Sequence, residues 1–376
     1  MNTFEELGVM PEIRKAISEM GYAAPMPVQE EVIPLMLGET GDIIALAQTG
    51  TGKTAAFVIP IVQNLLEDRL TGKQKGIGVL ILSPTRELAL QTSECVREYT
   101  KYTNLKYSVI FGGVNQSKQT DQLKHGVDIL IATPGRLLDL ISQGYINLNS
   151  VKYFVLDEAD RMLDMGFIND IRRILPMLPV NKQTLCFSAT MPKEMLLLAR
   201  TMLRNPIKIE VGNTSVNKSN ISQFVYYVEK KDKNNLLIKL LEESKNKSVI
   251  VFSQTKHNAD RIVRILKKAG IGSEAIHGNK SQNARQSALF NFKSGKTRVM
   301  VATDIASRGI DIQELPMVIN YDLPKVAETY IHRIGRTGRA GHNGTALSFC
   351  SSNEYGIIRS IQKLTGKKIN RATIPV

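Results

Sequence analysis

The sequence has few cysteines and no long uncharged hydrophobic stretch. Its three cysteines, Cys95, Cys186 and Cys350, lie far apart and lack the spacing of metal ligands, so we expect a reduced protein without disulfides or zinc. No apolar run approaches the ~20 residues that span a bilayer, and the N-terminus lacks the layout of a signal peptide. We therefore expect a soluble cytoplasmic protein that does not associate with membranes.

Acidic residues are also in deficit, because 35 Asp and Glu face 49 Lys and Arg, giving a formal net charge of +14. This charge favours a polyanionic partner, although a basic surface that only aids solubility explains it equally well. The hydrophobic fraction of 43% is typical of globular proteins. A chain of 376 residues is longer than one hydrophobic core usually supports, so we expect two domains.

The segment Ala47 to Thr54 is typical of a phosphate-binding loop. The pattern of such loops is Gly-x-x-x-x-Gly-Lys-Thr, and this segment ends in the same Gly-Lys-Thr. It lies between an apolar run, Ile43 to Ala47, and a helical pattern, Thr54 to Leu66. Glycines let backbone N–H groups wrap the phosphates, and the helix N-terminus adds partial positive charge. We expect Lys53 to contact the β- and γ-phosphates of a nucleotide and Thr54 to bind Mg²⁺.

Residues upstream of this loop suit an adenine base. The amide of Gln29 offers a donor and an acceptor that match the N6 and N7 edge of adenine, and Phe4 could stack on its face. Taken alone, Phe4 is better explained as a core residue and Gln29 as a surface polar residue. The phosphate-binding loop that follows favours the adenine pocket.

Short apolar runs recur along the first half, and a polar or glycine-containing turn follows each. This alternation with helical segments predicts a parallel sheet covered by helices on both faces. Functional residues of such sheets gather at the carboxyl ends of the strands. The expected strands are Val79–Leu82, Ser108–Phe111, Ile129–Ala132, Tyr153–Leu156 and Thr184–Phe187.

The acidic turn after Leu156 indicates the chemistry. Asp157 follows an apolar strand, as the second metal-binding residue of a phosphate-loop ATPase does, and Glu158 could orient and deprotonate the attacking water. By itself the turn would be explained as a solvated start of a helix, where carboxylates are favoured. The phosphate-binding loop in the same half favours the catalytic interpretation.

Regular patterning fades past Pro206, and the polar residues 212–220 indicate a flexible linker. We therefore expect domains at 1–210 and 223–376, joined by a linker at 211–222. Two α/β domains joined in this way imply a cleft that ligands close.

The second domain has helical patterns at Ala259–Lys268, Gln282–Phe292 and Glu354–Leu364, but no phosphate-binding loop. Its expected strands are Phe224–Val228, Val249–Phe252, Ser273–Ile276, Val299–Ala302, Met317–Asn320 and Ala346–Phe349.

Arg336 and Arg339 lie three residues apart in a segment that we expect to be helical, so both could face one side of a turn. They could act as arginine fingers that stabilise charge developing on the γ-phosphate. A basic turn that grips nucleic acid is the alternative from spacing alone.

Over essentially its whole length the chain resembles the bacterial-type minimal core of DEAD-box ATP-dependent RNA helicases, in superfamily two. This resemblance implies an α/β fold of two tandem RecA-like domains. The matching segments are Phe4 with Gly21, Pro25 and Gln29 (Q motif), Ala47–Thr54 (I), Pro84–Leu88 (Ia), Thr133–Arg136 (Ib), Asp157–Asp160 (II), Ser188–Thr190 (III), Val251–Gln254 (IV), Gln282 with Arg285 downstream of it, Thr303–Asp311 (V) and His332–Arg339 (VI).

The resemblance also implies roles for individual residues. The expected catalytic residues are Lys53, Asp157, Glu158, Arg336, Arg339 and His332, with Thr54 and Asp157 on Mg²⁺. The expected ATP contacts are Phe4, Tyr22, Pro25, Gln29, Gln48, Thr49, Gly50, Thr51, Gly52, Lys53, Thr54, Gly309 and, at the ribose, Asp311. Asp160, Ser188, Thr190 and His332 would couple the two domains. The expected RNA contacts are Pro84, Thr85, Arg86, Gly112, Gly113, Thr133, Gly135, Arg136, Gly278, Gln282, Arg285 and Thr303.

These roles imply RNA-stimulated ATP hydrolysis that opens short duplexes or remodels ribonucleoproteins, with contacts to the RNA backbone rather than to the bases. Two alternatives remain open, an ATP-gated RNA clamp that serves as an assembly scaffold and a DNA-directed helicase. We expect a monomeric core that could work with protein cofactors. The sequence does not identify the RNA or the pathway.

Overall fold

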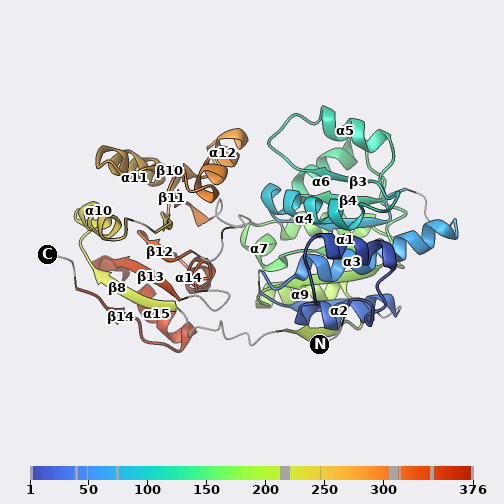
Figure 1. Ribbon diagram of the computed structural model, residues 1–376, viewed down its shortest axis with the longest axis horizontal. Coiled ribbons are helices and arrows are strands. Elements are labelled where there is room, and N and C mark those ends of the chain that lie inside the picture. Colours follow the sequence, from blue (N-terminus) through green and yellow to red (C-terminus); the bar gives the residue numbers. More distant parts are fainter. Residues whose placement is uncertain are drawn as a thin grey trace. The chain divides into compact units, whose positions relative to one another are not determined.

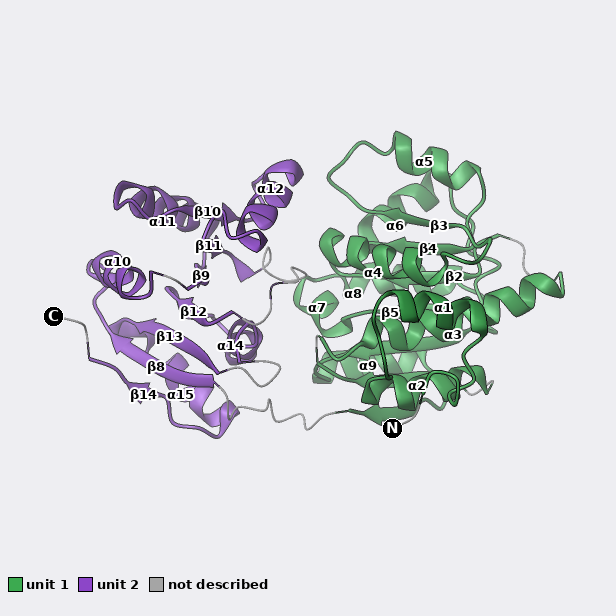
Figure 2. Cartoon of the chain, viewed as in Figure 1, with its two compact units in different colours: residues 1–214 green, residues 215–376 purple. Residues whose placement is uncertain are grey.

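The computed structural model describes residues 3–38, 41–48, 50–72, 76–211, 221–245, 247–304, 312, 315–338 and 343–373. The chain divides into two compact units, Met1–Thr214 and Ser215–Val376 (Figure 2). Residues 212–220, most of the predicted linker, lie outside the described ranges. No helix in these ranges is long and apolar enough to cross a membrane.

The first unit is built on a seven-stranded sheet in the order β3-β4-β2-β5-β6-β1-β7, and every neighbouring pair is parallel. Figure 1 labels β3 and β4 of this sheet and most of its helices. Its strands are β1 (Ile43–Leu46), β2 (Val79–Leu82), β3 (Tyr107–Ile110), β4 (Ile129–Ala132), β5 (Tyr153–Leu156), β6 (Gln183–Ser188) and β7 (Ile207–Glu210). Its helices are α1 (Pro11–Glu19), α2 (Pro27–Leu37), α3 (Lys53–Leu70), α4 (Arg86–Tyr99), α5 (Ser117–Lys124), α6 (Pro134–Ser142), α7 (Ala159–Asp164), α8 (Ile168–Ile174) and α9 (Lys193–Met202), with a short 3₁₀ turn at Leu175–Met177.

Both faces of this sheet are buried, which explains why its central strands are continuously apolar. Side chains alternate between the faces of a strand. In β2, Val79 and Ile81 therefore join one hydrophobic cluster, together with residues of α1 to α4. Leu80 and Leu82 join the other cluster, together with residues of α6 to α9.

The second unit repeats this sheet in the order β10-β11-β9-β12-β13-β8-β14, again parallel throughout. Its strands are β8 (Ile221–Tyr227), β9 (Val249–Phe252), β10 (Ser273–Ile276), β11 (Val299–Ala302), β12 (Met317–Asn320), β13 (Gly344–Cys350) and β14 (Asn370–Arg371). Its helices are α10 (Lys233–Glu243), α11 (Lys256–Lys268), α12 (Gln282–Lys293), α14 (Ala327–Ile334) and α15 (Tyr355–Thr365), with a 3₁₀ turn at Ser352–Glu354.

The predicted fold class of two mostly parallel sheets with helices on both faces is confirmed, and the predicted central strands are present to within about three residues. Two edge strands contradict the sequence analysis. Patterning was expected to fade past Pro206, yet β7 pairs with β1 there, and β14 pairs with β8. Only Ile209 of β7 is buried, and both residues of β14 are exposed, so neither strand carries an apolar run. β8 begins at Ile221, inside the predicted linker.

Candidate functional site

The predicted phosphate-binding loop joins β1 to α3. Gly50 and Gly52 have φ angles of 86° and 84°, in the left-handed region that favours glycine. A Cβ at Gly52 would lie 2.4 Å from Gln29 Nε2 and 2.8 Å from Met26 Sδ, so a larger residue there would displace these two side chains. Thr51 Oγ1 closes the turn by donating to the carbonyl of Gln48 at 2.7 Å. Thr49 lies outside the described residues.

Lys53 begins α3 and is only 5% exposed. Its Nζ has no hydrogen-bond partner among the residues that the structure describes. A buried ammonium without a partner is costly, so an anion at this helix N-terminus would stabilise it. Thr54, the next residue of the same helical turn, is half-buried and carries a hydroxyl group. The loop and Lys53 therefore fit a nucleotide phosphate.

Asp157 follows β5 and is 4% exposed. Burial, together with the neighbouring Glu158 carboxylate, raises the pKa of Asp157 to about 7, although Lys53 and Arg161 act in the opposite direction. The protein alone therefore undercompensates this negative charge, as expected where a divalent cation binds. No group of three or more His, Cys, Asp or Glu in the described ranges could hold a metal ion. A Mg²⁺ on Thr54 and Asp157 would need phosphate or water oxygens as further ligands.

Glu158 stands between β5 and α7 in a left-handed conformation, with φ of 56°. It is 4% exposed, and its Oε2 lies 2.5 Å from Nη1 of Arg161, which is also buried. Non-glycine residues in this conformation cost on the order of 1 kcal/mol and cluster at functional sites. Arg161 was missed by the sequence analysis, although its spacing of three residues from Glu158 on a helix was a usable signal.

Asp160, Ser188 and Thr190 form one hydrogen-bonded group. Asp160 Oδ2 accepts from the backbone N–H and the hydroxyl of Thr190, both at 3.0 Å. The Ser188 hydroxyl accepts from Asp160 N at 3.2 Å and donates to the Thr190 carbonyl at 2.6 Å. The Ser188 carbonyl accepts from Ala47 N at 3.0 Å. The group therefore links the acidic turn to the start of the phosphate-binding loop.

The predicted adenine segment contacts the same loop through Gln29, which is 6% exposed. Its Nε2 donates to the Gly52 carbonyl at 3.2 Å, and its Oε1 accepts from Met26 N at 2.9 Å. Each amide atom has a second site, so one donor and one acceptor remain for a base edge. Phe4 is 8% exposed and packs in the core, whereas Tyr22 is 53% exposed and Pro25 is buried.

The predicted RNA-binding residues of the first unit follow β2, β3 and β4, which are neighbours in the sheet. They therefore gather at one edge of the sheet. Thr85 caps α4 by accepting from Leu88 N at 3.3 Å. Arg86 lies over the Phe111 ring, with 4.2 Å from its guanidinium carbon to the ring centre. The glycines Gly112, Gly113 and Gly135 are exposed, Thr133 and Arg136 are half-buried, and Pro84 is buried.

The predicted RNA-binding residues of the second unit also follow neighbouring strands. Gly278 follows β10 and is exposed, Thr303 follows β11 and is half-buried, and Gln282 and Arg285 lie on the first turn of α12. Of the remaining predicted residues, Gly309, Asp311 and Arg339 lie outside the described residues.

The prediction that Arg336 lies on a helix is wrong. His332 is on α14, but this helix ends at Ile334, and Gly335 caps it. Thr337 instead forms an isolated parallel bridge with Leu315, and Leu315 N donates to the Arg336 carbonyl at 3.0 Å. These contacts draw the chain out of the helix, so the helical spacing proposed for Arg336 and Arg339 does not apply. Arg336 is 6% exposed.

Comparison with known proteins places this site in a family. The family model for DEAD/DEAH box helicases matches residues 26–198, and the model for the helicase conserved C-terminal domain matches residues 232–341. The chain is 41% identical to the DEAD-box ATP-dependent RNA helicase CshA of Geobacillus kaustophilus, over 100% of this chain and 79% of the relative. It is also 41% identical to the RhpA helicase of Helicobacter pylori, over 99% of this chain and 74% of the relative.

The chain belongs to the DEAD-box family of ATP-dependent RNA helicases. The structure is similar to that of S. cerevisiae Dbp5 bound to RNA and ADP–BeF₃, with a TM-score of 0.87 and 34% sequence identity. The alignment covers 99% of this chain and 96% of Dbp5.

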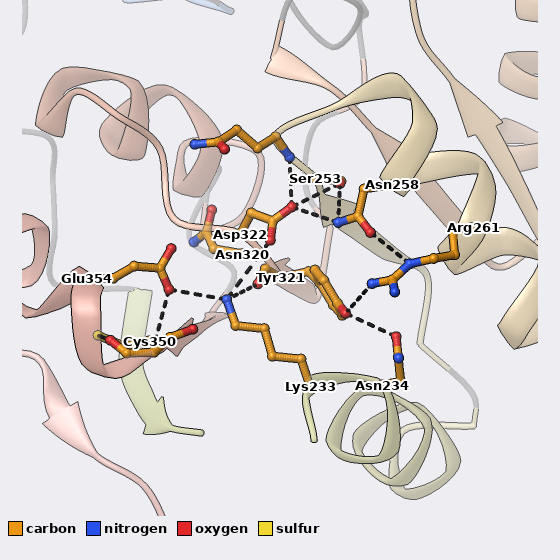
Figure 3. Close-up of polar contacts among 12 residues, drawn as sticks. Lys233, Asn234, Ser253, Asn258, Arg261, Asn320, Tyr321, Asp322, Cys350 and Glu354 are labelled. Carbon is orange, nitrogen blue, oxygen red and sulfur yellow. Dashed lines mark hydrogen bonds and ion pairs between the residues drawn. The ribbon is translucent and has the colours of Figure 1, made fainter. Parts of the chain in front are cut away.

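In this DEAD-box helicase, the second unit holds a partly buried polar cluster around Lys233 that the sequence analysis did not single out (Figure 3). Asp322 follows β12, and its Oδ2 accepts from Ser253 Oγ at 3.0 Å, Gln254 N at 2.9 Å and Asn258 Nδ2 at 2.9 Å. Lys233, at the start of α10, donates to the Tyr321 carbonyl at 3.1 Å and to Glu354 at 3.2 Å, and lies 3.9 Å from Asp322 Oδ1. A single acidic residue just past an apolar strand was the signal that could have found Asp322.

A second buried ion pair of the helicase joins α14 to the end of β11. Arg333 is 2% exposed and binds both carboxylate oxygens of Asp304, at 2.6 and 2.8 Å. Its Nη1 also donates to Asn320 Oδ1 at 3.1 Å and to the Asp322 carbonyl at 2.6 Å. Such a bidentate pair fixes geometry as well as contributing energy. It therefore ties the segment that carries His332 to the segment that carries Thr303.

Proposed function

We propose that this DEAD-box helicase uses ATP to open short RNA duplexes locally, and that RNA stimulates its ATP hydrolysis. One observation carries the proposal for this chain. The buried ammonium of Lys53 lacks a hydrogen-bond partner among the described residues, in a loop where Gly50 and Gly52 adopt left-handed backbone conformations, and the undercompensated Asp157 belongs to the same unit. A nucleotide phosphate with a divalent cation would satisfy both charges.

In the proposed site, Lys53 and the backbone of residues 48–52 hold the phosphates, with Thr54 and Asp157 on Mg²⁺. Bound Mg²⁺ would neutralise charge that develops on the phosphates. Glu158 orients and deprotonates the attacking water, and its pairing with Arg161 supports that orientation. Gln29 holds the adenine edge through the donor and the acceptor that its contacts leave over, with Phe4, Tyr22 and Pro25 around the base.

For coupling, we propose that the second unit completes the site. Arg336 and Arg339 would stabilise the γ-phosphate in the transition state, and Gly309 and Asp311 would contact the ribose. Asp160, Ser188, Thr190 and His332 would transmit closure to the RNA. The hydrogen bonds that tie Asp160 and Thr190 to Ser188, and Ser188 to Ala47, support this role in the first unit.

RNA would run over the carboxyl ends of the strands in both units. Exposed glycines and short hydroxyl side chains suit phosphates and 2′-hydroxyls, so binding is expected to ignore base identity. The proposed contacts are Pro84, Thr85, Arg86, Gly112, Gly113, Thr133, Gly135 and Arg136 in the first unit, and Gly278, Gln282, Arg285 and Thr303 in the second.

Closure would bend the bound strand, which its complement cannot follow. Stacking in DNA averages about 1.4 kcal/mol per step, so separating about five steps costs roughly 7 kcal/mol. That cost is within reach of one nucleotide-driven closure for short duplexes. It does not favour long processive unwinding.

We further propose that the helicase core works as a monomer in the cytoplasm, with protein cofactors adding specificity. Its three cysteines are free, which fits a reducing compartment. The working domain boundaries are 1–210 and 223–376, with 211–222 as the linker. The two compact units of the structure divide at residue 214, which falls inside this linker.

The decisive experiment is steady-state ATP hydrolysis with single-stranded RNA, with DNA of the same sequence, and with neither. Strong stimulation by RNA alone is expected, and hydrolysis indifferent to RNA would refute the coupling. Equal stimulation by DNA would favour a DNA-directed helicase. The Glu158→Gln variant should bind ATP and RNA normally but turn over at least 100-fold more slowly. Wild-type turnover by that variant would refute the role of Glu158.

A further inference from the structure

We propose that Gln119 is a positioning residue for RNA, which sets the geometry of all three RNA-binding elements of the first unit. The inference rests on the proposed RNA path, to which it adds a residue outside every motif used above. Gln119 lies on α5, in a polar helix whose sequence gives no sign of a role. Its side chain is nevertheless buried, with 7% of the residue exposed.

The amide of Gln119 makes three hydrogen bonds. Its Oε1 accepts from Phe111 N and from Arg136 Nη1, both at 3.1 Å. Its Nε2 donates to the Phe111 carbonyl at 3.2 Å. One side chain therefore replaces a strand partner for Phe111, just past the end of β3, and simultaneously binds the arginine that follows β4.

These contacts hold the Gly112-Gly113 turn from both sides. Gln119 fixes Phe111 before the turn, and Arg136 fixes Val114 after it, because Arg136 Nη2 donates to the Val114 carbonyl at 3.1 Å. The glycines have no side chains of their own to anchor the turn. A Cβ on either would meet nothing within 4 Å, so the outer face of the turn is open.

The third element is connected through the Phe111 ring. Arg86 lies over this ring at 4.2 Å, and a cation–π contact of this kind restrains the guanidinium. Gln119 thus acts on Arg86 through Phe111, on Gly112-Gly113 through the backbone, and on Arg136 directly. Backbone donors bind phosphates well only when their positions are preorganised, so loosening Gln119 should weaken RNA binding without altering ATP chemistry.

The test is Gln119→Leu, with Gln63→Leu as a matched control. Gln63 is a buried glutamine of the same unit, also 7% exposed, and it too bonds a distant backbone through both amide atoms, accepting from Met10 N and donating to the Gly8 carbonyl. The two variants should therefore lose similar stability. The readouts are the RNA concentration that half-saturates ATP hydrolysis, kcat at saturating RNA, RNA-independent hydrolysis and the urea unfolding midpoint.

Gln119→Leu is expected to raise the half-saturating RNA concentration about tenfold, with kcat and RNA-independent hydrolysis within twofold of wild type. Gln63→Leu should leave the RNA concentration unchanged. Equal shifts in the two variants would show a general loss of stability and overturn the proposal, as would a change in kcat alone. Wild-type hydrolysis that ignores RNA would instead refute the proposed function, and this inference with it.

The conservative variant Gln119→Glu sharpens the assignment. A carboxylate keeps the contacts with Phe111 N and Arg136, but it places a second acceptor against the Phe111 carbonyl, where Nε2 donates in the wild type. Its half-saturating RNA concentration should therefore lie between that of wild type and that of the Leu variant. A Glu variant as weak as the Leu variant would overturn the claim that the acceptor contacts position the RNA-binding elements.

Discussion

The two units of this helicase have the same sheet topology, but the buried lysine that begins the equivalent helix has hydrogen-bond partners in only one of them. Adding seven to each strand number of the first sheet reproduces the order of the second. In both units the first strand leads to a helix whose first residue is a buried lysine, Lys53 on α3 and Lys233 on α10. Lys53 Nζ has no hydrogen-bond partner in the described structure, whereas Lys233 binds Glu354 and the Tyr321 carbonyl.

The acidic residues repeat the contrast. Asp157 follows β5, and Asp322 follows β12, the strand in the equivalent place. Burial leaves Asp157 with a raised pKa, whereas Asp322 accepts three hydrogen bonds and lies near Lys233 (Figure 3). A nucleotide site therefore requires more than a lysine and an aspartate at the ends of two strands. The lysine must lack a hydrogen-bond partner, and the aspartate must keep a charge that its neighbours do not fully compensate. A glycine-containing loop must lie in the same unit.

The units also differ in charge. Residues 1–214 hold 22 Lys and Arg and 23 Asp and Glu, a net charge of −1, whereas residues 215–376 hold 27 and 12, a net charge of +15. All of the excess positive charge thus belongs to the unit without the phosphate-binding loop. Long-range attraction of a polyanion is accordingly expected mainly from the second unit.

Exchanging each lysine for methionine should give the largest difference. Lys53→Met is expected to lower kcat for ATP hydrolysis by about 10³-fold, because a phosphate loses its charged partner. Lys233→Met should retain hydrolysis within a fewfold per folded molecule. Steady-state hydrolysis at saturating RNA measures both. Comparable losses in the two variants would contradict the claim that only one lysine meets nucleotide.

Stability should respond in the opposite order. Lys233→Met removes the charged partner of Glu354, which keeps only its bond from Ser351 N, and the donor to the Tyr321 carbonyl, so the free energy of unfolding should fall by about 3 kcal/mol. Lys53→Met removes a buried ammonium without a hydrogen-bond partner, which is favourable, but it also removes the attraction of Lys53 for Asp157. The nucleotide-free protein should therefore lose much less stability from Lys53→Met than from Lys233→Met. Urea unfolding followed by circular dichroism, without nucleotide, measures both. Equal destabilisation by the two variants would contradict the difference between the two lysines.

The aspartates should also have effects of opposite sign. Asp157 has a pKa of about 7 in the folded protein against its ordinary value of 3.8. Between these pH values the folded state binds the extra proton, so this group makes stability fall as pH rises from about 4 to about 7. At pH 8, Asp157→Asn should therefore stabilise the nucleotide-free protein, on the order of 2 kcal/mol, and should remove this slope.

Asp322→Asn should instead destabilise by about 2 kcal/mol, because the acceptor of three hydrogen bonds is weakened. Thermal unfolding of both variants in EDTA, at several pH values from 4 to 8, separates the two cases. If both variants changed the stability at pH 8 in the same direction, Asp157 and Asp322 would not differ in how well the protein compensates their charges.

The charge difference should give the smallest effect. Lys267→Ala with Lys268→Ala, in the last turn of α11, is expected to weaken RNA binding about threefold and to make its salt dependence shallower. The matched pair Arg172→Ala with Arg173→Ala, exposed in the last turn of α8, should change neither. RNA titrations at several salt concentrations test this. A larger effect from the α8 pair would place the attraction in the first unit.

The sequence predicted those elements whose burial requires a continuous run of apolar residues. Val79 to Leu82 is apolar throughout because helices cover both faces of β2, so its limits were found without error. The edge strand β7 buries one residue in four and was missed. The end of α14 was missed too, because Thr337 leaves the helix to pair with Leu315, a contact from a distant segment that no local pattern records.

The candidate site follows the same rule. Residues with distinctive chemistry at strand ends, such as Asp157 and Thr85, were expected there and are found there. Gln119 and Lys233 were not singled out, because a glutamine in a polar helix and a lysine in a basic stretch are ordinary on a surface. Their importance arises from burial, which only the packing of remote segments creates. The catalytic and RNA-binding roles remain predictions.

The place of β1 in its sheet also affects synthesis of the chain. β1 pairs with β6 and β7, and Asp42, just before β1, accepts a hydrogen bond from Thr184 N, 142 residues further along the chain. At translation rates of 5–20 residues per second, about 7 to 28 seconds separate the two segments as they leave the ribosome. The nascent chain therefore carries its phosphate-binding loop long before the strand that orients the loop has partners. ATP can begin to stabilise this unit only when synthesis of the unit is almost complete.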